Sequence, residues 1–257
     1  VATQVSSGVK MLRMTRLSVN LNKVALLRNT RDVGMPDVVR AARIAVDAGA
    51  YGITVHPRPD ERHTRPSDVV DLSAFTQEAG VEFNIEGNPT PTFLELVHQV
   101  VPAQCTLVPD SPDQRTSDHG WDLAADGARL RPVIADLKAR GIRVSLFMDS
   151  EPSLIAPVAA IGADRIEIYT EPYAAAFGTA DQAKELDACA NCAGEAERAG
   201  LGVNAGHDLN LHNLPTLCQH VPGILEVSIG HALVADALEL GLAETVGAYL
   251  HALSSTG

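Results

Sequence analysis

The sequence predicts a single-domain α/β protein, a (β/α)8 TIM barrel, and three observations support this prediction. First, one phrase recurs along the chain: a helical stretch, a glycine and a short β-branched run, as in QEAGVEFNIE and KARGIRVSLFMD. Second, eight such units fit into about 240 residues, as this barrel requires. Third, no Pro/Ser-rich linker divides the 257 residues. Residues 1–15 are expected to be an N-terminal extension or vector-derived remnant, and residues 16–257 the barrel domain.

The expected elements alternate along the chain. The strands are short apolar runs at residues 16–22, 52–56, 81–86, 104–110, 143–149, 165–171, 202–206 and 224–230. A helical pattern follows each strand, at residues 36–49, 67–79, 90–101, 123–140, 152–161, 180–199, 210–220 and 231–253. Several of these helices end at a glycine, which readily adopts the left-handed conformation that terminates helices: Gly49, Gly80, Gly141, Gly162 and Gly200.

Alternation within the strands favours a closed barrel over an open, doubly wound sheet. Ile53 and Val55 are apolar, for example, whereas Thr54 and His56 beside them are polar. An open sheet with helices on both faces needs apolar side chains at both sets of positions. The inner face of a barrel accommodates polar side chains that bond to one another or to a ligand. No GxGxxG motif follows the first strand, which disfavours a dinucleotide-binding fold.

Composition excludes several classes of protein. The net charge of −12 leaves no excess of basic side chains to neutralise phosphates, so we expect no nucleic-acid partner and no anionic membrane surface. No run of about 18 apolar residues suggests a membrane span. Four cysteines suit a reducing cytoplasm, and the CxxC of Cys189 and Cys192 is expected to pack in a core, because it lies inside a helical stretch.

Polar and titratable residues gather where the predicted strands end, and that edge carries the active site in this fold. They are Asn20, Asn22, Lys23, His56, Arg58, Glu86, Asp110, Asp149, Glu167, Thr170, Asn204, His207, Gly230 and His231. Any one of them could be solvated or internally bonded. So many from separate strands indicate a functional site.

Two regions are expected to bind phosphate. The segment HPRPDERHTR, residues 56–65, concentrates three arginines in an acidic protein, and arginine binds phosphate oxygens in bidentate fashion. The segment NKVALLRNTR adds Arg28 and Arg31. Gly230 precedes the last helical pattern, where free backbone N–H groups would form a phosphate site. This arrangement fits a substrate, or a pair of substrates, with two phosphates.

Glu86, His56 and His207 are candidates for proton transfer. Burial in a barrel raises the pKa of a glutamate, and the pKa of histidine lies near neutrality without perturbation. Such a set suits enolisation, imine formation and dehydration of sugar-like carbonyl compounds.

In their order along the chain, several motifs resemble the pyridoxine 5'-phosphate synthase family: SVNLNKVALLRNTR, GITVHPRPDERH, FNIEGNPT, LVPD, VSLFMD, IEIYTE, VNAGHDLNLHN and IGHALV. The resemblance extends from about Leu17 to Leu250. It implies a barrel that condenses 1-deoxy-D-xylulose 5-phosphate with 3-amino-2-oxopropyl phosphate, without a metal or organic cofactor. The products are pyridoxine 5'-phosphate, phosphate and water. The resemblance also implies a homo-octamer built from dimers.

The resemblance further implies residue roles. His56 and Glu86 match the family's proton acceptors, His207 its proton donor, and Glu167 the group that stabilises the transition state. Binding of the deoxyxylulose phosphate falls to Arg58, His63 and Thr116. Binding of the amino ketone and its phosphate falls to Asn20, Arg31, Gly230 and His231.

The chain also departs from the family pattern. Where the family has Asn-x-Asp-His, this chain has Asn22 and Lys23 in place of the Asp-His pair. We still expect both to bind substrate, with Lys23 as a fixed positive charge. Asp208 stands where the family has a glycine, so we assign it no substrate contact. Asn204 and Gly206 are expected to let the backbone approach the substrate.

Three other functions stay open. A metal-dependent hydrolase or isomerase would use His56, His207, Glu86 and Asp149, although no HxH motif follows the first strand. A Schiff-base aldolase would use Lys23 as its nucleophile. A barrel that binds a phosphorylated ligand without turnover would not need three acid–base groups at one cavity.

Overall fold

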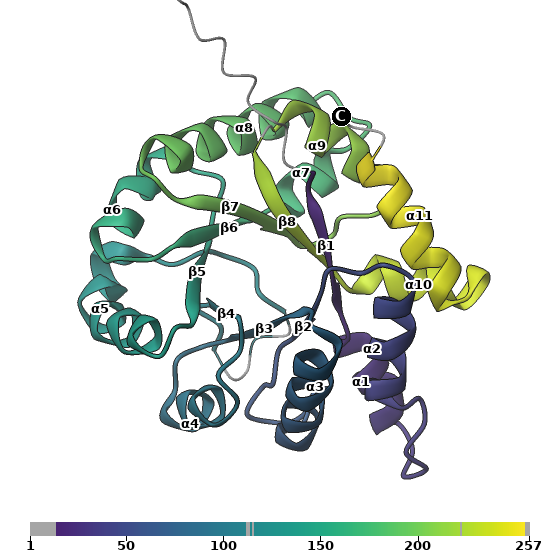
Figure 1. The fold of residues 1–257 in the computed structure, drawn as a ribbon. Coiled ribbons are helices and arrows are strands. Elements are labelled where there is room, and N and C mark those ends of the chain that lie inside the picture. Colours follow the sequence, from purple (N-terminus) through teal and green to yellow (C-terminus); the bar gives the residue numbers. More distant parts are fainter. Residues whose placement is uncertain (1–13, 112–113, 115, 222, 255–257) are drawn as a thin grey trace, which may run out of the picture.

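The computed structural model describes residues 14–111, 114, 116–221 and 223–254. Within these residues, eight parallel strands form a closed barrel in chain order, and β8 pairs with β1 (Figure 1). The strands are β1 (Arg16–Asn20), β2 (Gly52–Val55), β3 (Glu82–Gly87), β4 (Gln104–Leu107), β5 (Arg143–Met148), β6 (Arg165–Tyr169), β7 (Gly202–Gly206) and β8 (Ile224–Ile229). The predicted TIM barrel is therefore confirmed. The expectation for residues 1–15 falls mainly outside the described residues.

Helices surround the barrel and connect its strands (Figure 1). They are α1 (Asn22–Asn29), α2 (Val38–Asp47), α3 (Pro66–Ala79), α4 (Pro91–Val100), α5 (Leu123–Ala139), the 3-10 turn η1 (Pro152–Leu154), α6 (Ile155–Ala160), α7 (Glu171–Ala176), α8 (Gln182–Arg198), α9 (Leu214–His220), α10 (His231–Leu240) and α11 (Leu242–Ser254). In the described chain, no helix is both long and apolar enough to cross a bilayer.

Some connections differ from the sequence-based prediction. The first strand ends at Asn20 instead of residue 22, because Asn20 Oδ1 accepts a hydrogen bond from the Asn22 backbone N–H at 3.0 Å and the chain turns into α1. The sixth strand likewise ends before α7. The single helix predicted at residues 231–253 is two helices, divided at Gly241, where a φ of 83° ends α10.

Polar side chains fill the barrel interior, as the alternation predicts. Ser18 Oγ lies 2.6 Å from Thr54 Oγ1, the Asn84 amide donates to Thr54 Oγ1 at 3.4 Å, and the Thr106 hydroxyl donates to Asn84 Oδ1 at 3.1 Å. These contacts cross four adjacent strands and satisfy groups that are buried. The barrel wall is thus rigid beneath the strand ends that carry the site.

Asn204 belongs to this interior network. Its Oδ1 accepts from Arg165 at 2.9 Å, and its amide donates to Gln104 Oε1 at 3.3 Å. Arg165 also lies 3.8 Å from the Glu226 carboxylate. The Asn204 side chain is therefore committed within the barrel, and the expectation that Asn204 lets the backbone approach the substrate stays a prediction.

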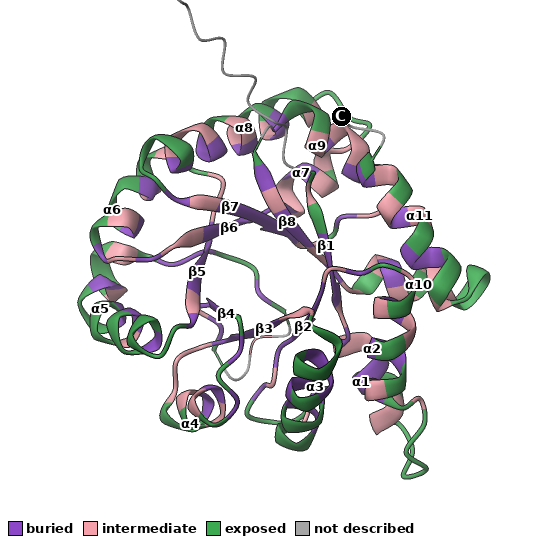
Figure 2. Ribbon diagram, in the orientation of Figure 1, coloured by how far each residue is buried: buried purple, intermediate pink, exposed green. Residues whose placement is uncertain are grey.

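The apolar positions of the strands pack outward against the helices. Ile53 and Val55 are fully buried in one core cluster, which includes residues of the strands and of the surrounding helices. Figure 2 shows that the strands are mostly buried. Cys189 and Cys192 are buried members of the same cluster on α8, and burial raises the pKa of each thiol to about 12. The CxxC is thus a packing element, as predicted.

Candidate active site

A cavity of about 620 Å³ opens at the carboxyl ends of the strands. Twelve of the thirteen residues predicted for catalysis or substrate binding line it: Asn20, Asn22, Lys23, His56, Arg58, His63, Glu86, Thr116, Glu167, His207, Gly230 and His231. They come from the ends of β1, β2, β3, β6, β7 and β8 and from the loop after β4, so the closure of the sheet is what brings them together.

Arg31 is the predicted residue that the structure keeps apart. It lies just beyond α1, is exposed, and is not among the residues that line the cavity. Arg28, the other arginine of that segment, forms an ion pair with Asp68. Its guanidinium also donates to the backbone oxygen of His63 at 3.3 Å. Arg28 therefore holds the β2–α3 loop, and within this subunit neither arginine adds to the positive charge of the cavity wall.

Asn22 and Lys23 occupy the first turn of α1 at the rim. Asn22 Oδ1 accepts from the backbone N–H of His56 at 2.8 Å and from the Thr64 hydroxyl at 3.0 Å. The Lys23 side chain lines the cavity, and its positive charge contributes to lowering the pKa of His63. Asn22 thus fixes the end of β2, whereas Lys23 adds a positive charge to the cavity wall.

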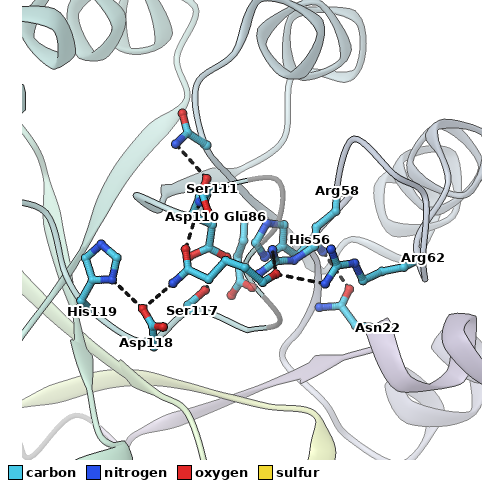
Figure 3. Close-up of polar contacts among 12 residues, drawn as sticks. Asn22, His56, Arg58, Arg62, Glu86, Asp110, Ser111, Ser117, Asp118 and His119 are labelled. Atoms are coloured by element: carbon cyan, nitrogen blue, oxygen red, sulfur yellow. Dashed lines mark hydrogen bonds and ion pairs between the residues drawn. The ribbon is translucent and has the colours of Figure 1, made fainter.

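The β2–α3 loop brings Arg58 into an ion pair with Asp110, which follows β4 (Figure 3). Both side chains are buried, and the Ser117 hydroxyl donates to the same carboxylate oxygen at 2.7 Å. Arg58 also donates to the backbone oxygen of Gln114 at 2.9 Å. These contacts hold the guanidinium at the cavity wall.

His63 is held as a neutral hydrogen-bond donor. Its Nδ1 accepts from the backbone N–H of Thr64 at 2.9 Å, so the proton of the neutral ring sits on Nε2. Burial, with the nearby charges of Arg58 and Lys23, lowers the pKa of His63 to about 4. Burial and the same arginine also lower the pKa of His56 well below its usual value. Both rings are neutral near pH 7.

Glu86 and Glu167 place two buried carboxyl groups on the cavity floor. Burial raises the pKa of Glu86 well above its usual value, and the negative charges of Glu167 and Asp110 raise it further. Burial and the charge of Glu226 raise the pKa of Glu167. Both groups can therefore hold protons near neutral pH, unlike solvated carboxylates.

Gly206 leaves the space that the Glu167 carboxyl group occupies. A side-chain carbon at this position would lie 2.3 Å from Glu167 Oε1. Gly230, before α10, has a similar role, since a side-chain carbon there would lie 3.1 Å from the Asn20 side chain. Gly206 therefore leaves room for the Glu167 side chain, and this explains the glycine without a contact to a substrate.

His207 follows β7 with an unusual backbone. Its φ is 82°, and that of Asp208 is 56°, so two successive residues that are not glycine adopt left-handed conformations. Such residues cost about 1 kcal/mol or more each and concentrate at functional sites. The His207 ring packs against Phe147 and Tyr169, with centroid distances of 4.9 and 5.3 Å. Burial lowers the pKa of His207 to about 4, against the opposing charge of Asp208.

The described residues offer no group of three or more His, Cys, Asp and Glu side chains placed to hold a metal ion. Asp149, which the metal-dependent alternative would use, accepts from the Gly120 backbone N–H at 2.9 Å and does not line the cavity. The donor set required by that alternative is therefore not assembled in the described structure.

Comparison with known proteins agrees with the geometry. The model of the family described as "Pyridoxal phosphate biosynthesis protein PdxJ" matches residues 17–255. The chain belongs to the PdxJ family. A PdxJ relative, the pyridoxine 5'-phosphate synthase of Albidiferax ferrireducens, is 58% identical over 246 residues, covering 93% of this chain and 98% of that protein. The synthase of Mesorhizobium japonicum is 52% identical and covers 92% and 98%, respectively.

PdxJ membership confirms the predicted family and the predicted activity: the chain is a pyridoxine 5'-phosphate synthase of vitamin B6 biosynthesis. Solved structures show the same fold at low identity. A chain of tryptophan synthase from M. tuberculosis superposes with a TM-score of 0.64 at 14% identity, covering 94% of this chain and 93% of that one. At this identity the likeness concerns the fold alone.

Two residues of this PdxJ site had no predicted role: Arg62 and Ser117, which line the cavity. Asp110, one of the polar residues predicted at the strand ends, pairs with Arg58 at the cavity wall. Arg62 lies inside the basic motif that predicted Arg58 and His63, so that motif was sufficient to find it. Ser117 follows Thr116 in an irregular loop, and no periodicity in the sequence indicates where its side chain points.

Proposed function

We propose that this synthase condenses 1-deoxy-D-xylulose 5-phosphate with 3-amino-2-oxopropyl phosphate in the cavity at the barrel mouth. The observation that carries the proposal is the separation of functions in one cavity: cationic and donor groups at the rim, and buried carboxyl and imidazole groups below. The rim suits two phosphates. The floor suits proton transfers during enolisation, imine formation and loss of water.

The proposed proton acceptors are His56 and Glu86. The lowered pKa of His56 leaves its ring neutral, as an acceptor must be. Burial raises the pKa of Glu86 and so favours its protonated form. The ammonium group of the amino ketone would favour the ionised form of Glu86, because an adjacent opposite charge lowers a carboxyl pKa. Substrate binding would thus make Glu86 an acceptor.

His207 is the proposed proton donor, and Glu167 the group that stabilises the transition state. Burial lowers the pKa of His207 to about 4, so its ring is neutral at pH 7. The negative charge of bound phosphates would raise its pKa and favour the protonated, donating form. Glu167, protonated or ionised according to its partners, can bond to a hydroxyl or an amine that forms during ring closure.

The two substrates are proposed to occupy opposite parts of the rim. Arg58, His63 and Thr116 would bind the deoxyxylulose phosphate, with the phosphate competing against Asp110 for the Arg58 guanidinium. Asn20, Gly230 and His231 would bind the amino ketone, whose phosphate would meet the N-terminus of α10. The contact inferred for Arg31 is not supported within one subunit, because Arg31 lies outside the cavity.

The assembly and location of the protein are also proposed. Apolar side chains project from α1 and the loop after it, where Leu27, Val33 and Met35 are 50%, 55% and 69% exposed. An exposed apolar group of this kind favours burial against a second copy, in line with the proposed homo-octamer.

Four free cysteines favour a reducing cytoplasm. The chemistry proposed needs no cofactor.

The deciding experiment supplies both substrates to the purified protein. Appearance of the pyridine chromophore, together with release of inorganic phosphate, is the expected result. Binding of either substrate without product would favour the ligand-binding alternative. Turnover only after addition of zinc or manganese would favour the metal-dependent one.

A further inference from the structure

The turn that carries His207 needs an external restraint. Two successive left-handed residues, His207 and Asp208, follow directly after β7. Left-handed backbone is unfavourable for residues with a Cβ, so such a turn persists only where its surroundings over-determine it. Ring packing against Phe147 and Tyr169 fixes the imidazole but not the peptide groups that set its direction.

Thr170, which directly follows the neighbouring strand β6 and precedes α7, supplies this restraint. Its hydroxyl Oγ1 lies 2.6 Å from the backbone oxygens of both Gly206 and His207, as a single donor shared between them. Its backbone N–H donates to the Gly206 oxygen at 2.9 Å. Thr170 is fully buried, so no water competes for the hydroxyl. Thr170 therefore bonds two successive backbone carbonyl groups, that of Gly206 and that of His207 itself.

Asn213 holds the other end of the turn. Its amide donates to the backbone oxygen of Asp208 at 3.1 Å, and its own backbone oxygen accepts from the Tyr173 hydroxyl at 2.8 Å. Tyr173 belongs to α7, the helix that begins directly after Thr170. The three carbonyl groups of residues 206–208 are thus bonded to one unit built from β6, α7 and the start of α9.

We propose that Thr170 is a positioning residue for His207: its hydroxyl sets the backbone of residues 206 and 207 and thereby aims the imidazole at the reacting atoms. Thr170 also lies three residues after Glu167 on the same segment. The same hydroxyl therefore fixes the position of His207 relative to Glu167, which catalysis requires to within a fraction of an ångström. This inference rests on the proposed role of His207 as proton donor.

A purely structural role predicts a different outcome. Loss of any buried hydroxyl that bonds backbone oxygens lowers stability, wherever it lies. Thr76 is the matched case: it is buried, and its hydroxyl lies 2.9 and 3.1 Å from the backbone oxygens of Leu72 and Ser73 on α3, away from the cavity. Thr76→Val should lower the melting temperature while kcat and KM stay unchanged.

The test compares Thr170→Val, Thr170→Ser and Thr76→Val in the full-length protein. Thr170→Val should lower kcat about tenfold with KM changed less than about twofold, because substrate binding is retained while the donor is misaligned. Thr170→Ser, which keeps the hydroxyl, should restore kcat to within about threefold of the parent. If Thr170→Val does not fold, Thr170→Cys fills a similar volume with a weaker donor and should lower kcat in the same direction.

Two further results separate this inference from the proposed function. His207→Ala should itself lower kcat, and adding Thr170→Val to it should cause no further loss, since there is no ring left to aim. An unaltered kcat in His207→Ala would refute the donor role and the inference with it. A kcat loss in His207→Ala but not in Thr170→Val, or equal losses in the valine and serine variants, would refute the inference alone.

Discussion

Asn22 Oδ1 accepts the backbone N–H of His56 at 2.8 Å, and the Thr64 hydroxyl donates to the same oxygen at 3.0 Å. The side chain thereby joins α1 to the end of β2, next to a proposed proton acceptor. Both contacts need an acceptor oxygen, and neither needs a negative charge. An amide can therefore stand where the PdxJ pattern has a carboxylate without loss of this connection.

Substitutions at Asn22 should follow acceptor capacity instead of charge. Asn22→Asp keeps the oxygen and should retain kcat within about threefold. Asn22→Leu leaves two donors without a partner, and at about 1 kcal/mol for each it should lower kcat by about thirtyfold. Steady-state kinetics with both substrates measure the effect. A leucine variant as active as the parent would show that His56 needs no such support.

Lys23 is expected to act through its charge. Lys23→Ala should raise KM for a phosphorylated substrate about tenfold and lower kcat much less, because a point charge binds the anion without entering the proton transfers. Lys23→Arg keeps the charge and should recover most of the affinity. Lys184→Ala, on the exposed surface of α8, is the control for loss of a positive charge elsewhere.

A chemical role for Lys23 would give the opposite pattern. If Lys23→Ala abolished turnover while substrate affinity stayed the same, the amine would act as a nucleophile. Borohydride would then trap a covalent adduct on Lys23, as the aldolase alternative requires.

Substitution of Glu86 should lower kcat strongly. Glu86→Gln cannot accept a proton, and loss of a positioned acid–base group lowers kcat by about a hundredfold or more. KM should change little, because the amide retains the size and polarity of the carboxyl group. Glu95→Gln, at an exposed position of α4, is the matched control and should leave both constants unchanged. Equal activity of the two variants would remove Glu86 from the mechanism.

The strand pattern allowed most of this site to be predicted because barrel closure obeys a general rule. Residues at the carboxyl ends of eight strands must meet, so Glu86, Glu167 and His207 are close whatever the details of their loops. The alternation of apolar and polar positions likewise predicts which side chains face the interior. Periodicity and fold class together were sufficient for these residues.

Loops follow no such rule, and the failures lie there. Arg31 belongs to a basic segment that suggests phosphate binding, but the extra helix α1 carries it to the surface. The left-handed backbone of His207 could not be predicted either, because Thr170, a residue distant in the sequence, bonds that turn, and local propensity does not favour it.

Activity should not depend on a metal ion. Exhaustive chelation followed by assay in metal-free buffer is expected to leave kcat unchanged, because the proposed acid–base groups are histidines and carboxyl groups that act without a Lewis acid. Loss of activity that zinc or manganese restores would instead support the metal-dependent alternative. The control is the same chelation step followed by dialysis against the original buffer.

The raised pKa of Glu167 should appear in stability as well as in catalysis. Burial and the charge of Glu226 raise that pKa from 4.5 to about 8 in the folded protein. Because the folded state binds the proton more tightly than the unfolded state, the contribution of Glu167 to stability is fully present below about pH 4.5 and is lost as the pH rises toward 8. Glu167 therefore costs stability at pH 8.

Glu167→Gln removes this titration and keeps the shape of the side chain. The variant should melt about 3 °C or more above the parent at pH 8. The difference should shrink at pH 5, where Glu167 of the parent is still protonated and does not destabilise the fold. The buried histidines have lowered pKa values, so they destabilise the folded protein toward acid pH. They titrate in both proteins, so their effect cancels in the difference. Glu239→Gln, on the exposed surface of α10, should show no such pH dependence. An equal melting difference at both pH values would mean that Glu167 ionises normally in the folded barrel.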